Sequence, residues 1–221
     1  MSEFSIHWNI LPAAQRGLWP SLSATVASRF VLYGGTAVAL RLGHRTSIDF
    51  DFFTEMPLDR AGLDRAFPFL SKSKVLQDST NTLGMLSPSP SGTVKISFFG
   101  GISIGRVGTP DQTPDGVLQI ASLLDLLATK LKDIQQRIES KDYLDIIAIL
   151  KSGTPLDEGL AAASVLYGPA FQPSEAVKAL TCFEGGDLST LESDDKKYLV
   201  HAVSRVRHIP PLGVLSRSLS L

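Results

Sequence analysis

Two glycines separate two short apolar runs near the start of this 221-residue chain, and an alternating segment follows them. The stretch FVLYGGTAVALRLGHRTSIDFDFF occupies residues 30 to 53. FVLY has the content of a buried strand, and TAVALRL has the composition of a short helix ending at Gly43. In SIDFDFF polar and apolar residues alternate, which predicts a half-buried strand with Ile48, Phe50 and Phe52 on one face and Ser47, Asp49 and Asp51 on the other. The stretch therefore predicts a strand, a glycine turn, a helix and a second strand.

The two aspartates of the alternating segment are spaced to share a small cation. Residues i and i+2 of a strand point the same way, so the α-carbons of Asp49 and Asp51 are expected about 6.6 Å apart. Mg²⁺ takes oxygen ligands and keeps waters or substrate phosphates in its remaining positions. We interpret the pair as a site for Mg²⁺ or Mn²⁺. The alternative is a solvated strand face on which the aspartates pair with Arg41 or Arg45.

The two glycines before the helix predict an anion site. A strand, a Gly-Gly turn and a helix start present backbone N–H groups and the positive end of a helix dipole. No Lys-Ser or Lys-Thr follows, so this is not a Walker A loop, and the dinucleotide pattern GxGxxG is also missing. We therefore interpret Gly34, Gly35 and Thr36 as a turn that holds phosphate, next in sequence to a strand that holds a metal.

The remainder of the first half is mixed in its secondary structure. Residues 13 to 29 and 58 to 71 favour helices, and SKVLQ and NTLGMLS favour strands. GTVKISFFGGISIGRVG predicts two more strands that meet at Gly100 and Gly101. TPDQTPDG, at residues 109 to 116, has the composition of a loop and marks a domain boundary. The sequence thus predicts an α/β core over residues 1–112 and a helical domain over residues 113–221.

The helical part contains the strongest periodic signal of the chain. VLQIASLLDLLATKLKDIQQRIES, at residues 117 to 140, has apolar residues at helical spacing. On such a helix Lys130, Arg137 and Lys141 fall within about 40° of one another, at the border of the apolar stripe. This basic ridge either meets a triphosphate or consists of long side chains that pair with Asp133 and Glu139.

A second helix is expected over KDYLDIIAIL, at residues 141 to 150. Asp145 lies there among Leu144, Ile146 and Ile147. An acid in that position either orients a buried lysine or arginine or is a carboxylate of the site.

Composition limits the classes of function. With 43% hydrophobic residues the chain can bury a large core, and a net charge of −1 gives no overall attraction to nucleic acid or anionic membranes. The single Cys182 cannot form an internal disulfide, which suits a reducing compartment. No stretch approaches the roughly 18 apolar residues of a membrane span, and no secretory leader is recognisable. We therefore expect a cytoplasmic protein without a membrane partner.

Two motifs resemble those of a known family. YGGTAVALRLGHRTSIDFDFF resembles the first motif of the AbiEii/AbiGii-type toxin nucleotidyltransferases, a branch of the DNA polymerase β-like nucleotidyltransferase superfamily. The HRxSxDxDFF wording of this branch is matched by His44, Arg45, Ser47, Asp49, Asp51, Phe52 and Phe53. KLKDIQQRIESKDYLDIIAIL is similar to the family's K…R…KDxxD helical motif, through Lys130, Arg137, Lys141, Asp142 and Asp145.

The resemblance implies an α+β fold, with a nucleotidyltransferase-type mixed β-sheet, flanking helices and a helical C-terminal half. It implies a transferase that moves a nucleoside monophosphate from an NTP to a hydroxyl group and acts as the toxin of a toxin–antitoxin or phage-defence system. An RNA such as tRNA would be the acceptor and an antitoxin protein the partner, while a small-molecule acceptor stays open. The implied catalytic residues are Asp49, Asp51, Lys130 and Asp145. The implied nucleotide-binding residues are Gly34, Gly35, Thr36, Arg45, Ser47, Lys130, Arg137 and Lys141.

One position departs from the superfamily pattern. A later strand of these enzymes carries a third carboxylate in the pattern hKhDh, and TVKISFFGG has Ser97 in that place. The third acid normally helps to deprotonate the acceptor hydroxyl and holds one of two metals. Three interpretations follow: Asp145 replaces the acid, catalysis uses one metal, or the chain is a binding module that retains a nucleotide or a partner protein without fast transfer.

Overall fold

The structure is a computed structural model that describes residues 5–221, and these residues form two compact units. The unit that we call the sheet unit comprises residues 5–105, 109–122 and 216–221. The helical unit comprises residues 106–108 and 123–215.

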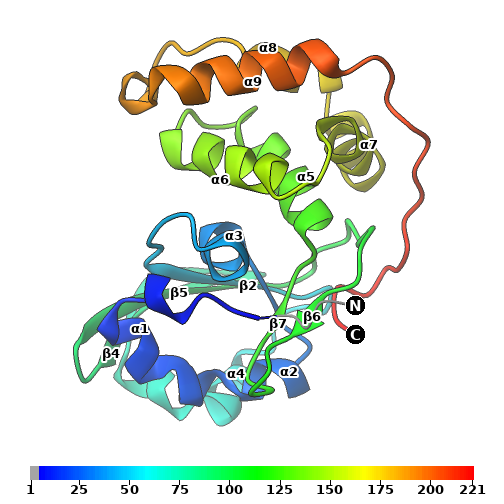
Figure 1. Cartoon of the computed structure of the whole chain (residues 1–221). Helices are drawn as coiled ribbons and strands as arrows, with labels where there is room; N and C mark the ends of the chain where they lie inside the picture. Colours follow the sequence, from blue (N-terminus) through cyan, green and yellow to red (C-terminus); the bar gives the residue numbers. More distant parts are fainter. Residues whose placement is uncertain (1–4) are drawn as a thin grey trace. The chain divides into compact units, whose positions relative to one another are not determined.

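The sheet unit is built on a mixed sheet of seven strands, in the order β3-β4-β5-β2-β1-β7-β6 (Figure 1). The strands are β1 (Val31–Tyr33), β2 (Asp49–Phe53), β3 (Lys74–Ser79), β4 (Thr82–Ser89), β5 (Gly92–Phe99), β6 (Asp111–Gln112) and β7 (Gln119–Ile120). β2 runs antiparallel to β1 and parallel to β5, and β5 is antiparallel to β4. The α+β fold expected from the sequence is confirmed.

Strand register gives the sheet one apolar and one polar face around β2. Phe50 and Phe52 are fully buried, whereas the alternate residues Asp49 and Asp51 are partly exposed. Ile48, expected on the apolar face, precedes the first residue of β2 and is 65% exposed. Helices and short 3₁₀ segments surround the sheet, and Figure 1 shows α3 on one side with α1, α2 and α4 on the other. They are η1 (Trp8–Ile10), α1 (Ala13–Leu18), η2 (Trp19–Leu22), α2 (Ala24–Ala27), α3 (Gly34–Leu42), α4 (Arg60–Ala66) and η3 (Pro68–Lys72).

Aromatic side chains join the apolar face to the segments that cover it. The ring of Trp19 lies 6.2 Å from that of Phe50, and the rings of Phe30 and Phe67 lie 5.1 Å and 5.2 Å from that of Phe98. Aromatic pairs at such separations add to the stability gained by burying their surface. The buried face of β2 thereby fixes the strand whose other face carries the aspartates.

Three predicted elements of the sheet unit differ from the structure. The helix expected over residues 13–29 is broken into α1, η2 and α2, because Pro20 cannot continue a helix from within. The helix expected over residues 58–71 is divided into α4 and η3 at Pro68 for the same reason. The strand expected after Gly101 does not form, since Gly101 and Gly105 take positive φ angles that turn the chain.

The helical unit contains α5 (Leu123–Asp133), α6 (Ser140–Lys151), α7 (Leu156–Tyr167), η4 (Gly168–Ala170), α8 (Pro173–Ala179), η5 (Leu188–Thr190) and α9 (Ser193–Arg205). The continuous helix expected over residues 117–140 is wrong at both ends. Gln119 and Ile120 form β7, and residues 134–139 form turns between α5 and α6. Lys130, Arg137 and Lys141 therefore do not lie on one helix, and the predicted ridge does not form in that way.

The units also divide at a different place from the boundary expected at residue 112. β6 pairs with β7, which pairs with β1, so residues 109–122 complete the sheet. The six C-terminal residues return to the sheet unit, where Leu219 is fully buried. The Leu219 N–H donates to Glu55 Oε2 (3.1 Å), and the Leu221 N–H donates to Gln119 Oε1 (3.0 Å). Among the described residues no helix is long and apolar enough to cross a membrane.

We predict that Leu219→Ala lowers the free energy of unfolding of the sheet unit by about 2–5 kcal/mol, the usual cost of emptying a buried leucine site. Leu221→Ala is the matched control, because Leu221 is 63% exposed, and it is expected to change the value by about 0.5 kcal/mol or less. Urea unfolding followed by tryptophan fluorescence measures both. Equal effects of the two substitutions would contradict the packing of the C-terminal segment.

Candidate active site

The aspartates of β2 lie beside the glycine turn on the polar face of the sheet. Tyr33, the last residue of β1, is paired with Asp51, so the turn that follows is next to that carboxylate. Gly34 has a φ angle of +71°, and a Cβ there would be 2.7 Å from Asp51 Oδ2. Two features require glycine at this position: the positive φ angle and the carboxylate that occupies the place of a side chain.

A short hydrogen-bonded chain ties the first turn of α3 to β2. Thr36 Oγ1 is hydrogen-bonded to Ser47 Oγ (2.8 Å) and to the backbone carbonyl of Asp49. Thr36 is 1% exposed and Ser47 is 8% exposed, so water competes little for these bonds. The helix start and the carboxylate strand are thus held together by side chains of the predicted motif.

The guanidinium group of Arg45 lies next to the second glycine. A Cβ on Gly35 would overlap Arg45 Nη2 and would lie 3.3 Å from Ser47 Oγ. Arg45 also donates from Nη1 to the carbonyl of Thr46 (3.1 Å). A guanidinium group, the N–H groups of a helix start and two side-chain-free glycines at one turn form a cradle suited to phosphate.

Strand β5 brings two further side chains to the polar face. Its parallel pairing with β2 aligns Lys95 with Asp49 and Ser97 with Asp51. Lys95 Nζ lies 3.5 Å from Asp49 Oδ2, and the two side chains are 47% and 35% exposed. The partner of Asp49 is therefore Lys95, which the sequence analysis did not identify. The alternation of TVKISFF puts Lys95 and Ser97 on one face, but it cannot name the neighbouring strand.

The residues of this site fit a small divalent cation. Two carboxylates on one strand face offer hard oxygen ligands, and the missing side chains at Gly34 and Gly35 let the Asp51 carboxylate and the Arg45 guanidinium group approach the turn. Throughout residues 5–221 there is no cluster of three or more His, Cys, Asp or Glu side chains that could hold a metal ion. The donor set is the pair Asp49 and Asp51, which suits a cation that takes its other ligands from water and phosphate.

The second motif forms a buried ion cluster in the helical unit. The side chain of Lys130 is 3% exposed, with Nζ 2.6 Å from Asp142 Oδ1 and 2.9 Å from Asp145 Oδ2. Asp142 and Asp145 are fully buried. Arg137 Nε donates to Asp142 Oδ2 (2.7 Å), so the turn after α5 is joined to α6 by the same carboxylate.

The opposite charges of Lys130 and Asp142 each favour the ionised form of the other. Burial alone would lower the pKa of Lys130, but the charges of Asp145 and Asp142 outweigh it and hold that pKa above its ordinary value. Burial alone would raise the pKa of Asp142, but the hydrogen bond from Arg137 and the charge of Lys130 hold that pKa below its ordinary value. Lys130 and Asp142 are therefore both charged at neutral pH.

These contacts bear on the residues predicted from the second motif. The Lys130 ammonium group is shared by two buried carboxylates, which favours the interpretation in which Asp145 orients a buried cation. Lys141 lies at the surface, 54% exposed, and pairs with Glu139 (2.7 Å). The catalytic assignment of Lys130 and Asp145, and the nucleotide-binding assignment of Arg137 and Lys141, stay predictions.

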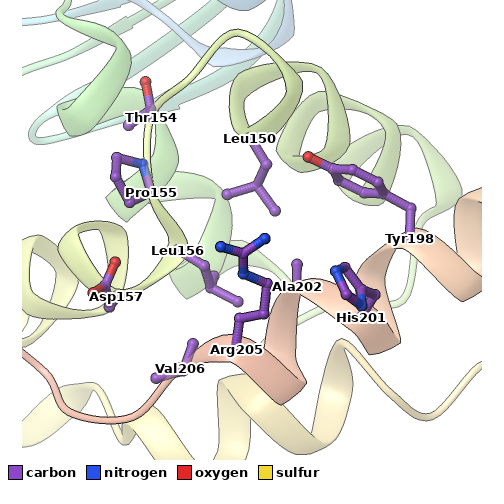
Figure 2. Close-up of a pocket in the computed structure, with 10 residues that line it drawn as sticks. All are labelled: Leu150, Thr154, Pro155, Leu156, Asp157, Tyr198, His201, Ala202, Arg205 and Val206. Carbon is purple, nitrogen blue, oxygen red and sulfur yellow. The ribbon is translucent and has the colours of Figure 1, made fainter.

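The helical unit also contains a pocket of about 380 Å³ between α6, the start of α7 and α9 (Figure 2). Its walls are Leu150, Thr154, Pro155, Leu156, Asp157, Tyr198, His201, Ala202, Arg205 and Val206. None of the motif residues lines it; among its polar lining residues Arg205 and His201 are exposed and Asp157 is partly buried. The pocket is therefore separate from the ion cluster of Lys130, Asp142 and Asp145.

Solved structures define the class to which this fold belongs. A protein of H. pylori assigned as a nucleotidyltransferase is similar with a TM-score of 0.58 and 16% identity, over 86% of this chain and 92% of that one. An antigenic nucleotidyltransferase-like protein of Paracoccidioides brasiliensis has a TM-score of 0.51 and 18% identity, over 85% of this chain and 94% of that one. At such identities the likeness concerns the fold, which is that of nucleotidyltransferases.

The sequence places the chain within this class. Residues 22–175 match the family described as "Nucleotidyl transferase AbiEii toxin, Type IV TA system", and the chain belongs to that family. An uncharacterized protein of Aquifex aeolicus (strain VF5) is 35% identical over 140 residues, which make up 62% of this chain and 66% of that protein, just under two thirds of its length. The resemblance noted from the two motifs is confirmed.

We predict that Lys130→Met lowers the free energy of unfolding of the helical unit by about 3–5 kcal/mol, because it leaves the buried Asp145 carboxylate without its cation. Lys141→Met removes a lysine from an exposed pair and is expected to cost about 1 kcal/mol or less. Chemical unfolding followed by far-ultraviolet circular dichroism compares the two variants with the wild type. If Lys130→Met lowers the free energy of unfolding no more than Lys141→Met does, the cluster is excluded as a source of stability.

The lowered pKa of Asp142 predicts a dependence of stability on acid. The stabilisation from this carboxylate is fully present above its unfolded-state pKa of about 3.9, and it is lost as the pH falls through the lower folded-state pKa. Unfolding free energies of the wild type and of Asp142→Asn between pH 6 and pH 2.5 test this. The difference between them is expected to shrink below about pH 4. A constant difference would contradict an ionised, stabilising Asp142.

Proposed function

We propose that this chain is a metal-dependent nucleotidyltransferase that transfers a nucleoside monophosphate from an NTP to a hydroxyl group and releases pyrophosphate. The observation that carries the proposal is the position of Asp49 and Asp51 on one face of β2, directly beside the glycine turn at the start of α3. Carboxylates suit a metal, and the turn suits phosphate. A metal–triphosphate complex needs both in one place.

The residues of the first motif, all in the sheet unit, then each have a role. Asp49 and Asp51 would hold Mg²⁺ or Mn²⁺, which when bound neutralises phosphate charge and orients the triphosphate. The N–H groups that begin α3, at Gly34, Gly35 and Thr36, would receive the β- and γ-phosphates. Arg45 would add a charged donor at the same turn. Ser47 and Thr36 hold the turn against β2, so the donors are in place before the nucleotide arrives.

The reaction is a displacement at the α-phosphorus. The acceptor hydroxyl oxygen forms a bond to this phosphorus, and the bond from phosphorus to the bridging oxygen of the leaving group breaks. Pyrophosphate leaves with the electron pair, and the hydroxyl proton passes to solvent. The positive groups at the glycine turn stabilise the charge that develops on the leaving pyrophosphate.

The family indicates the biological setting of this reaction. Its description names a toxin of a type IV toxin–antitoxin system, so we propose a cytoplasmic toxin with a cognate antitoxin protein. We propose RNA, tRNA among the candidates, as the acceptor. A small-molecule hydroxyl is the alternative within the same chemistry, and mass analysis of labelled products separates the two.

A second candidate function rests on Ser97. This serine is paired with Asp51 and is 4% exposed, at the place where a third carboxylate was expected. A serine cannot act unaided as a general base, so the fold could bind an NTP or a partner without fast transfer. Isothermal titration with an NTP and Mg²⁺, followed by a pyrophosphate-release assay, discriminates between the two functions. Binding without release favours the binding module.

We predict that Asp49→Asn and Asp51→Asn each reduce Mg²⁺-dependent pyrophosphate release by about two orders of magnitude or more, since each removes a charged ligand from the reacting centre. Each change also relieves repulsion between like charges, so thermal stability without Mg²⁺ is expected to stay equal or rise. Asp64→Asn, at an exposed position of α4, is the matched control and is expected to keep full activity. Wild-type release by both site variants would overturn the metal assignment.

A further inference from the structure

We propose that this chain holds a single divalent cation, and that the Lys95 ammonium group supplies the positive charge that a second metal ion would otherwise bring. The inference rests on the proposed function, because it concerns the same carboxylates. It assigns a role to Lys95 and interprets Ser97 as part of a one-metal design.

The register of four strands defines the charges on the polar face. Asp49 is paired with Lys95 on β5, Lys95 with Leu86 on β4, and Leu86 with Lys74 on β3. In the same way Asp51 is paired with Ser97, Ser97 with Gly84, and Gly84 with Gln77. Residues paired in this way point to the same face of a sheet. Along these two rows the only acids are Asp49 and Asp51, and Lys95 is the cation directly paired with Asp49.

The Lys95 side chain is close enough to pair with Asp49, and its exposure allows it to move away. Its Nζ atom lies 3.5 Å from Asp49 Oδ2, which is within ion-pair distance. The 47% exposure of its side chain leaves it free to turn toward a phosphate oxygen when a metal takes the Asp49 carboxylate. A lysine is suited to this exchange, because its charge is a compact point on a flexible stem.

The balance of charge then limits the number of metals. Two carboxylates neutralise one divalent ion, and a second ion would need at least one more acid close to Asp51. The row of Asp51 offers a hydroxyl and a glycine instead, and Lys95 already adds a positive charge beside Asp49. Like charges this close repel each other strongly where water is partly excluded. A second metal ion would therefore find no further carboxylate on these rows, and the charge of Lys95 would repel it.

Mn²⁺ binding to the full chain tests the inference without relying on activity. Electron paramagnetic resonance of free Mn²⁺ counts bound ions with and without an NTP analogue that has a methylene group between the α- and β-phosphorus. We expect one Mn²⁺ per chain. Lys95→Ala is expected to tighten Mn²⁺ binding without nucleotide by up to about fivefold, because the Asp49 carboxylate no longer has to leave an exposed ion pair. Lys95→Arg keeps the charge and is expected to stay close to wild type.

Lys74→Ala is the matched control, because Lys74 lies on the same face three strands from Asp49 and its charge is screened at that distance.

The double variant Lys95→Ala with Ser97→Asp is expected to bind a second Mn²⁺. Two ions on the wild type, or an unchanged affinity in Lys95→Ala, would overturn the inference while leaving the nucleotidyltransferase intact. No Mn²⁺ binding at all, with or without nucleotide, would overturn the proposed function as well. Circular dichroism of each variant confirms that it is folded.

Discussion

The contact between the Asp51 carboxylate and Gly34 is the constraint on which the site of this protein depends. A backbone with a positive φ angle brings the start of α3 within reach of β2, and any side chain at that position would occupy the place of the carboxylate. Thr36, in the first turn of the helix, holds the same two elements together through Ser47 and the backbone carbonyl of Asp49. Phe50 and Phe52 fix β2 from the other face of the sheet. The site therefore follows from the packing of β2. Its apolar residues are buried on one face of the sheet, and its polar residues lie next to the start of α3 on the other.

The two charged motifs of the chain differ in what their burial allows. The carboxylate of Asp49 is 35% exposed, so water, a metal or a lysine can exchange at it. Lys130, Asp142 and Asp145 are at most 3% exposed and are already paired with one another. Removing one member of such a cluster leaves an uncompensated buried charge, which is strongly destabilising. This difference in exposure favours an exchangeable site at β2 and a structural role for the cluster, in which Arg137 and Asp142 connect the end of α5 to α6.

The sequence predicted the local features of this structure better than the long-range ones. The faces of β2 follow from a period of two, and the turn at Gly34 follows from residue types that tolerate it, so both could be derived from a few neighbouring residues. The pairing of β2 with β5 joins residues far apart in the chain, which no local pattern encodes, and Lys95 was missed for that reason. Helical periodicity continued past Asp133 because residues 134–139 contain no glycine or proline to end it. The helix ends at Asp133, and four residues later Arg137 contacts Asp142, an interaction that only the folded chain contains.

A nucleotidyltransferase moves the α-phosphoryl group together with its nucleoside, and a labelling experiment shows which phosphoryl group this protein transfers. The full chain is incubated with Mg²⁺, total RNA and an NTP that carries radioactive phosphorus at either the α- or the γ-position. We expect the α-label to become attached to the acceptor and the γ-label to appear only in released pyrophosphate. Transfer of the γ-label to the acceptor would contradict this expectation, and so would a chain that binds the nucleotide and leaves both labels in the NTP.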